Sequence, residues 1–145
     1  MRQNSFCTVN DYVLGFLPSY YALRLDCLNL RYKGGGLTEI EYLSEVEAFI
    51  SDLPGATRGR ILFILAKQYI KKEVRLTAHF LAGLIGRFGG QVIDFIMECV
   101  NRAIKTADCN SKKQGNIRTT AESVTVILDK RGRTATSLYP SRYYA

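Results

Sequence analysis

The spacing of apolar residues changes once along the chain, and this change constrains the fold more than any other feature. Between residues 91 and 106 apolar side chains recur at the helical period of about 3.6, whereas Val124, Val126 and Leu128 alternate with their neighbours at the strand period of 2. Asp129-Lys130-Arg131-Gly132 supplies turn residues, and residues 133–139 predict a returning strand that Pro140 ends. The sequence therefore predicts a β-hairpin in its C-terminal part.

Helices are predicted ahead of this hairpin. Thr38 and Glu41 form a T-x-x-E capping box that opens a helix ending at Pro54-Gly55. Three more helices are expected over residues 57–73, from Thr77 to Gly89-Gly90, and over residues 91–106. The periodicity of residues 1–36 does not decide between helix and irregular structure.

These elements predict one α+β domain over residues 1–145, with N-terminal helices packed on a small C-terminal antiparallel sheet. The helical part covers residues 37–107 and the antiparallel β part covers residues 115–145, in which residues 115–120 are a candidate third strand. A chain of 145 residues is long enough to bury one core.

Positive charge gathers in the second half of the chain. Residues 75–145 hold 11 Lys and Arg against 5 Asp and Glu, whereas residues 1–74 hold 9 against 8, within a net charge of +7. Clustered cations bind phosphates and release counterions, so a polyanion such as a nucleic acid is the favoured partner. An acidic protein partner and a merely solubilising charge are the alternatives.

Several classes of protein are disfavoured by composition. The N-terminal residues lack the unbroken apolar run of a signal peptide, and the longest apolar stretch, residues 80–86, is too short to cross a bilayer. Four cysteines without a Cys-x-x-Cys pair, together with a single histidine, argue against a zinc site. We expect no metal, no cofactor and no membrane span, and a chain of this size needs no disulfide.

The hairpin and the segment before it carry cations and hydroxyl groups at alternate positions. Arg side chains bind phosphate bidentately, and Ser, Thr and Tyr donate to its oxygens, so this pattern suits phosphodiester recognition. The candidate residues are Arg118, Thr119, Lys130, Arg131, Arg133, Thr134, Thr136, Ser137 and Tyr139. The alternative is an exposed, Thr-rich sheet face without a ligand.

His79 is the only histidine, and histidine is the side chain that most readily exchanges protons near neutral pH. Gly83 and Gly86 follow one and two turns later on its helix, where a strand or a substrate backbone can approach closely. His79 is therefore the candidate acid or base, and a surface histidine without catalytic function is the alternative.

The C-terminal part of the chain resembles a known family. The order of His79, the break Gly86-Arg87-Phe88-Gly89-Gly90, a helix and a closing hairpin is similar to toxin domains of the Barnase/EndoU/colicin/RelE class of bacterial polymorphic toxins. The hairpin carries the residues of the resemblance: a Val-rich strand over 124–128, the turn over 129–132, and Thr136-Ser137-Leu138-Tyr139-Pro140. Ser137 stands where the family commonly has Thr and Leu138 where it often has Ala. The resemblance covers about 60 of the 145 residues.

This resemblance implies a metal-independent ribonuclease, with transfer RNA as the frequent substrate. His79 would take the proton of the ribose 2′-hydroxyl, Arg118 and Arg133 would stabilise the charge growing on the phosphate, and Ser137 or Tyr139 would orient the phosphate or protonate the leaving oxygen. Thr119, Lys130, Arg131 and Thr136 would bind the RNA.

The resemblance also implies a biological setting. An antibacterial toxin of contact-dependent growth inhibition would be delivered as part of a larger secreted protein and act in the cytoplasm of the target cell, and an acidic immunity protein would be its partner. Two other functions stay open. One is a non-catalytic nucleic-acid-binding or regulatory protein, and the other is a viral or plasmid-encoded interaction protein whose Tyr- and Leu-rich N-terminal segment forms an oligomer interface.

Overall fold

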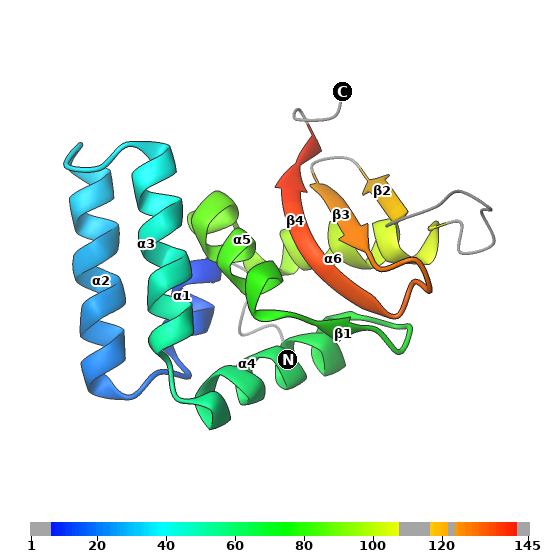
Figure 1. The fold of residues 1–145 in the computed structure, drawn as a ribbon, viewed down its shortest axis with the longest axis horizontal. Helices are drawn as coiled ribbons and strands as arrows, with labels where there is room; N and C mark the ends of the chain where they lie inside the picture. Colours follow the sequence, from blue (N-terminus) through cyan, green and yellow to red (C-terminus); the bar gives the residue numbers. More distant parts are fainter. Residues whose placement is uncertain (1–6, 108–116, 122–123, 142–145) are drawn as a thin grey trace.

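The computed structural model describes residues 7–107, 117–121 and 124–141, which form six helices and four strands in an α+β arrangement (Figure 1). In chain order these elements are α1 (Val9–Leu14), α2 (Ser19–Lys33), α3 (Glu39–Asp52), α4 (Gly55–Tyr69), β1 (Arg75–Leu76), α5 (Ala78–Phe88), α6 (Ile93–Lys105), β2 (Ile117–Ala121), β3 (Val124–Leu128) and β4 (Thr134–Pro140). The helices α2 and α3 lie at one end of the molecule and the sheet lies at the other.

The N-terminal region that the periodicity left open is helical where it is described. Thr8 caps α1 by accepting a hydrogen bond from the backbone N–H of Asp11. Three consecutive glycines, Gly34 to Gly36, separate α2 from α3, and Gly35 adopts a φ of 85°, which glycine takes without steric cost. The weak periodicity of α2 has a simple cause: apolar residues occur both on its buried side and on its exposed side.

The capping box predicted for α3 is confirmed, with the Thr38 hydroxyl accepting from the Glu41 backbone and the Glu41 carboxylate accepting from the Thr38 backbone. The predicted end of the next helix at residue 73 is wrong, because α4 ends at Tyr69. The N–H of Lys71 bonds to the side-chain oxygen of Asn101 on α6 instead of continuing the helix. This contact turns the chain into β1.

The sheet is mixed and has the strand order β1-β4-β3-β2. β2, β3 and β4 pair in antiparallel fashion, as the alternation predicts. β1 pairs in parallel with β4, so the prediction of a wholly antiparallel sheet that follows all the helices is wrong in this detail. β1 has only two residues, which is too short for a strand to show a periodic pattern in the sequence.

The turn between β3 and β4 forms as its residues predict. Gly132 has a φ of 72°, and its N–H donates to the carbonyl of Asp129. The Asp129 carboxylate accepts hydrogen bonds from the backbone N–H groups of Arg133 and Thr134. The side chain of Asp129 therefore fixes the turn, and the cations beside it are left to face solvent.

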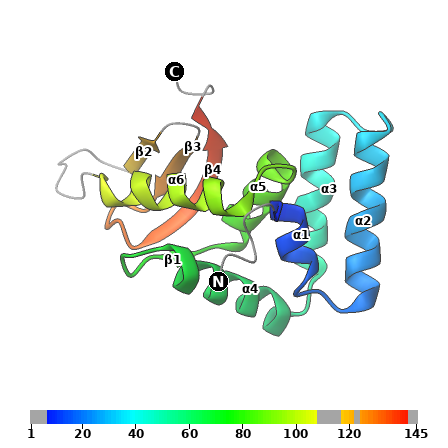
Figure 2. The same cartoon turned by 180° about the vertical axis from the view of Figure 1, so that it is seen from behind.

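One face of the sheet packs on α6 (Figure 2), whereas among the described helices α5 meets the sheet only along β4. Val124, Val126 and Leu138 are fully buried on the α6 side, against a helix face that includes Ile96, Val100 and other fully buried residues. We call the side of the sheet opposite α6 the outer face.

α5 lies along the edge of β4 that β1 leaves unpaired. The Thr77 hydroxyl donates to the carbonyl of Thr136, and the Arg87 guanidinium donates to the carbonyl of Leu138. Between these two bonds Gly83 meets the strand so closely that a Cβ atom there would lie 2.9 Å from the Leu138 carbonyl oxygen. The absence of a side chain at Gly83 thus allows a helix to cover a strand edge.

This contact predicts opposite effects of one substitution at two helical glycines. Gly83→Ala is expected to lower the free energy of unfolding by about 1–3 kcal/mol, because backbone atoms of β4 must move. Gly59→Ala on α4, where nothing lies within 4 Å of the new Cβ, is expected to raise it by about 0.5–1 kcal/mol. Urea unfolding monitored by circular dichroism measures both changes, and equal effects at the two positions would contradict the close contact.

Candidate functional site

The outer face of the sheet brings together residues from three strands. Because side chains alternate along a strand, the strand pairing places these residues in two rows across the face. The rows are Arg118, Ile127 and Ser137, and then Thr120, Thr125 and Tyr139. The predicted residues Ser137 and Tyr139 therefore share one face with Thr120 and Thr125, whose hydroxyl groups are hydrogen-bonded to each other at 2.9 Å, and Thr125 is fully buried. For Arg118 only the backbone position is described, and its side chain lies outside the described part of the structure.

Two of the predicted hydroxyl groups have partners within the fold. Thr119 points to the opposite side of the sheet, is buried, and donates from Oγ1 to the carbonyl of Ala103 on α6 at 2.7 Å. Thr136 sits where the β3–β4 register shifts, and its hydroxyl donates to the carbonyl of Ile127. Both hydroxyls stabilise the sheet, so neither side chain joins the outer-face rows.

Three predicted cations surround the turn at the tip of the hairpin. Lys130, Arg131 and Arg133 are exposed, and within the part of the chain that the structure describes none of them forms an ion pair. Arg133 and Tyr139 stand six residues apart on an extended chain, which is roughly 20 Å. Arg133 therefore belongs to the basic tip and is remote from the ring of Tyr139.

Arg87 is the cation that lies beside Tyr139. Its guanidinium carbon stands 4.3 Å from the centre of the Tyr139 ring, a cation–π contact, while Nη1 donates to the carbonyl of Leu138 at 3.2 Å. A guanidinium has five N–H donors, so this one bond leaves others for a ligand on the outer face. Arg87 therefore holds the edge of β4 and also places positive charge next to Tyr139.

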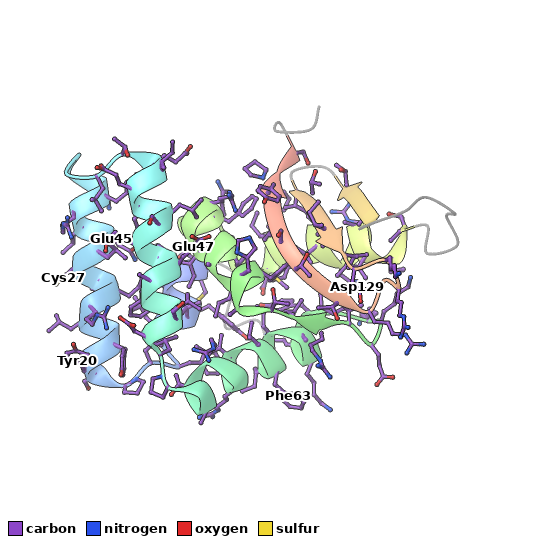
Figure 3. The ribbon with its side chains drawn as sticks, in the orientation of Figure 1. Tyr20, Cys27, Glu45, Glu47, Phe63 and Asp129 are labelled. Atoms are coloured by element: carbon purple, nitrogen blue, oxygen red, sulfur yellow. The ribbon has the colours of Figure 1, made fainter. Side chains whose placement is uncertain are left out.

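His79 pairs with a carboxylate that no sequence pattern indicates. Its Nδ1 lies 3.6 Å from Oε2 of Glu47 on α3, and the two side chains are 53% and 47% exposed. They border a shallow hollow of about 390 Å³ between α3 and α5, where Figure 3 shows Glu47 on the side of α3 that faces α5. The distance exceeds a hydrogen bond and is an ion-pair contact when the imidazole is protonated.

The edge contact also fixes where His79 stands relative to the sheet. It lies two residues after Thr77, which bonds to Thr136, and one helical turn before Gly83, which contacts Leu138. The contact of His79 is with Glu47 on α3, so its side chain lies beside the hollow between α3 and α5. Along α5 it stands one turn from the residues that meet β4.

Glu47 and Arg87 are the two residues of this site that sequence reasoning missed. Arg87 stands within the Gly86-Arg87-Phe88-Gly89-Gly90 break. A cation between glycines at the end of a helix is a sequence signal that could have identified it as a site residue. Glu47 is one of several acidic residues on α3, and only the packing of α3 on α5 distinguishes it.

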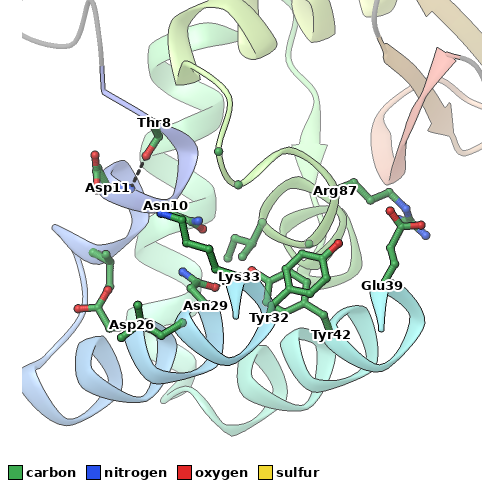
Figure 4. A pocket seen from close by; sticks show the side chains of 16 residues that line it. Thr8, Asn10, Asp11, Asp26, Asn29, Tyr32, Lys33, Glu39, Tyr42 and Arg87 are labelled. Carbon is green, nitrogen blue, oxygen red and sulfur yellow. Dashed lines mark hydrogen bonds between the residues drawn. The ribbon is translucent and has the colours of Figure 1, made fainter. Parts of the chain in front are cut away.

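A second hollow, of about 690 Å³, lies between α1, α2 and the C-terminal end of α5 (Figure 4). Its polar lining includes Asn10 and Asn29, and carboxylates such as Asp26 face it together with the cations Lys33 and Arg87. Because charges of both signs line this hollow, it does not have the uniform positive charge that a phosphate backbone requires.

The comparisons with known proteins leave the chain without an identified relative: it matches no family model, no curated protein and no solved structure. Among residues 7–107, 117–121 and 124–141, no group of three or more His, Cys, Asp or Glu side chains is placed to hold a metal ion. Within the same residues, no helix combines the length and the apolar character that crossing a membrane requires.

The double contact of Arg87 predicts a structural effect that a charge change alone would not produce. Arg87→Ala is expected to lower the free energy of unfolding by about 1–2 kcal/mol, through loss of the bond to Leu138 and of the stacking on Tyr139. Arg87→Lys should restore only part of this loss, because an ammonium does not reproduce the planar contact. As a control, Arg131→Ala at the exposed hairpin turn should change stability by less than about 0.5 kcal/mol in the same urea titration.

Proposed function

We propose that this protein is a metal-independent ribonuclease in which His79 and Glu47 carry out proton transfer at the edge of β4. The observation that supports the proposal best is the 3.6 Å pair of an imidazole and a carboxylate, the imidazole on a helix whose first residues are bonded to β4 through Thr77. A histidine with a neighbouring carboxylate is a common acid–base arrangement, because the carboxylate orients the ring through one nitrogen and leaves the other for the substrate.

The reaction would follow from the positions of these groups. His79 Nε2 removes the proton from a ribose 2′-hydroxyl, and the 2′-oxygen forms a bond to the adjacent phosphorus. The bond from phosphorus to the 5′-oxygen of the next nucleotide breaks, and that oxygen takes up a proton, from Ser137, Tyr139 or solvent. A 2′,3′-cyclic phosphate and a 5′-hydroxyl result.

The cations divide into two groups with different tasks. Arg87 lies beside Tyr139, so it is the described cation best placed to stabilise negative charge on a phosphate at the outer face. Lys130, Arg131 and Arg133 lie at the hairpin tip, where they would bind the RNA backbone away from the scissile bond. Arg118 occupies the row of Ser137 and would add to the first group.

Transfer RNA is the substrate we propose, and the resemblance to polymorphic toxin domains supports this choice. On the same ground we propose that the activity is an antibacterial toxin acting in the cytoplasm of a target cell and held in check by an acidic immunity protein. The excess of positive charge in residues 75–145 supports both an RNA substrate and an acidic inhibitor.

The catalytic proposal predicts cleavage of total transfer RNA by the purified protein in the presence of EDTA. His79→Ala is expected to lower the cleavage rate about 10²–10⁴-fold, because general acid–base catalysis contributes on this scale. Glu47→Gln is expected to lower the rate about tenfold or more. The matched control is Glu45→Gln, another exposed carboxylate on α3, which should cleave at the wild-type rate.

End-group analysis of the products separates the proposed chemistry from contamination. The wild-type protein should leave 2′,3′-cyclic phosphates, and inducible expression should arrest bacterial growth while His79→Ala does not. RNA that stays intact with a folded, inhibitor-free protein would contradict the proposal, and equal activity of wild type and His79→Ala would contradict the assigned site.

The basic tip of the hairpin predicts a separate effect on RNA affinity. The double substitution Lys130→Glu and Arg131→Glu should weaken RNA binding and reduce the slope of log affinity against log salt by about 2, since two phosphate contacts are lost. Arg60→Glu with Lys67→Glu changes the net charge equally on α4 and should leave the slope nearly unchanged. Filter binding with a non-cleaving variant measures both.

Binding that responds in this way without any cleavage would support the second candidate, a non-catalytic nucleic-acid-binding protein. The three exposed cations of the hairpin tip favour that alternative over other functions, because the tip can hold RNA whether or not the pair reacts.

A further inference from the structure

The side of α2 that points away from the rest of the molecule carries an apolar stripe. Tyr20, Leu23 and Leu30 are 64%, 63% and 67% exposed, and Cys27, also exposed, completes the spacing of 3, 4 and 3 residues. This spacing is the a/d pattern of a two-stranded coiled coil, here over residues 20–30 or about 15 Å of helix. We call these four residues the α2 stripe.

The α2 stripe lies opposite the residues that hold α2 in the fold. Leu25 and Leu28 are buried, and the ring of Tyr32 stacks on Tyr42 of α3. Figures 1 and 2 show α2 at the outer end of the molecule, with α3 on one side and no described element beyond it, and Figure 3 shows Tyr20 and Cys27 there. Leu30 also borders the hollow beside α1 and α5, and Arg24 lies 5.8 Å from the centre of the Tyr20 ring. These contacts leave Tyr20, Leu23 and Leu30 largely exposed, so they do not account for an apolar helix face.

We propose that the α2 stripe is the interface of a homodimer, in which α2 packs in parallel against α2 of a second copy. The charges beside the stripe supply the argument for this partner and this direction. Asp26 precedes Cys27 in the g position, and Arg31 follows Leu30 in the e position. Among the described residues neither side chain takes part in an ion pair.

In a parallel pair, a g residue of one helix faces the e residue five positions later on its partner, so Asp26 meets Arg31 of the second copy and the two-fold axis repeats the contact. An antiparallel pair would place Asp26 beside Asp26 of the second copy, and like charges repel. Arg24 would also meet its own copy, but it already pairs with Asp52 at 3.1 Å, so the repulsion rests on Asp26. The charge pattern of α2 is therefore complementary to itself in one direction only.

Net charge along the chain also agrees with association at this end. Residues 1–74 have nine cations against eight acidic residues, whereas residues 75–145 have a strong positive excess. Two copies that meet through α2 keep their sheets, at the far end of each molecule, away from one another.

Sedimentation equilibrium of the full chain over a range of concentrations tests the dimer. The wild-type protein should show a monomer–dimer equilibrium, and Leu23→Glu should raise the dissociation constant about tenfold or more, because each dimer loses two buried leucines. Ile40→Glu, at a side chain that is 81% exposed elsewhere, is the matched control and should not change it. A wild-type protein that is monomeric at every concentration would overturn the proposal.

The direction of packing has its own test. Asp26→Arg and Arg31→Asp should each weaken the dimer, and the double exchange should restore it, because the ion pair re-forms with its charges reversed. A dimer that Asp26→Arg strengthens would be antiparallel and would overturn the parallel arrangement.

Cys27 provides an independent readout, because residues of an a layer face their own copies across the two-fold axis. Treatment with diamide, which takes up the two electrons and two protons that the thiols lose, should give a disulfide-linked dimer on a non-reducing gel. Cys27→Ser should remove this dimer band. A band of equal intensity with Cys27→Ser would come from another cysteine and would overturn the assigned layer.

Discussion

The contact between α5 and the edge of β4 is the interaction on which the candidate site depends. A strand edge with unpaired carbonyl groups needs partners, and α5 supplies them from side chains at two points, Thr77 and Arg87. Gly83 lies between these points and lets the helix axis approach the strand. Without this contact the histidine of α5 and the hydroxyl groups of the hairpin would belong to separate parts of the fold.

In the contact between α5 and β4, Arg87 has both a structural role and a proposed chemical role. Arg87 satisfies a carbonyl group of β4 and also stacks on Tyr139, so the group that completes the strand edge is the group that brings positive charge to the outer face. Glu47 is positioned in a comparable way, because the packing of α3 on α5 that buries the core also carries its carboxylate to His79. The proposed catalytic groups thus stand on rigid elements, which favours a fixed geometry for proton transfer.

Local patterns in the sequence predicted those features that local interactions determine. The capping box at Thr38, the periodicity of α6 and the turn ending at Gly132 all depend on residues within a few positions of one another, and each is confirmed. β1 and the end of α4 were not predicted, because a long-range strand pairing and the contact of Lys71 with Asn101 decide them. Glu47 was missed for the same reason, since it lies 32 positions from His79 and no spacing rule connects the two.

The two ends of the molecule differ in the physical chemistry they present. The sheet end has cations at an exposed turn, which suits a charged, hydrated ligand such as an RNA backbone. The α2 end has apolar side chains flanked by Asp26 and by the basic residues Arg24 and Arg31, which suits burial against a surface of matched shape and charge. In the proposed dimer the apolar ends would meet and the basic ends would point away from each other. Each copy could then bind RNA without competition from its partner, and electrostatic repulsion between the basic halves would oppose dimerisation least in this arrangement.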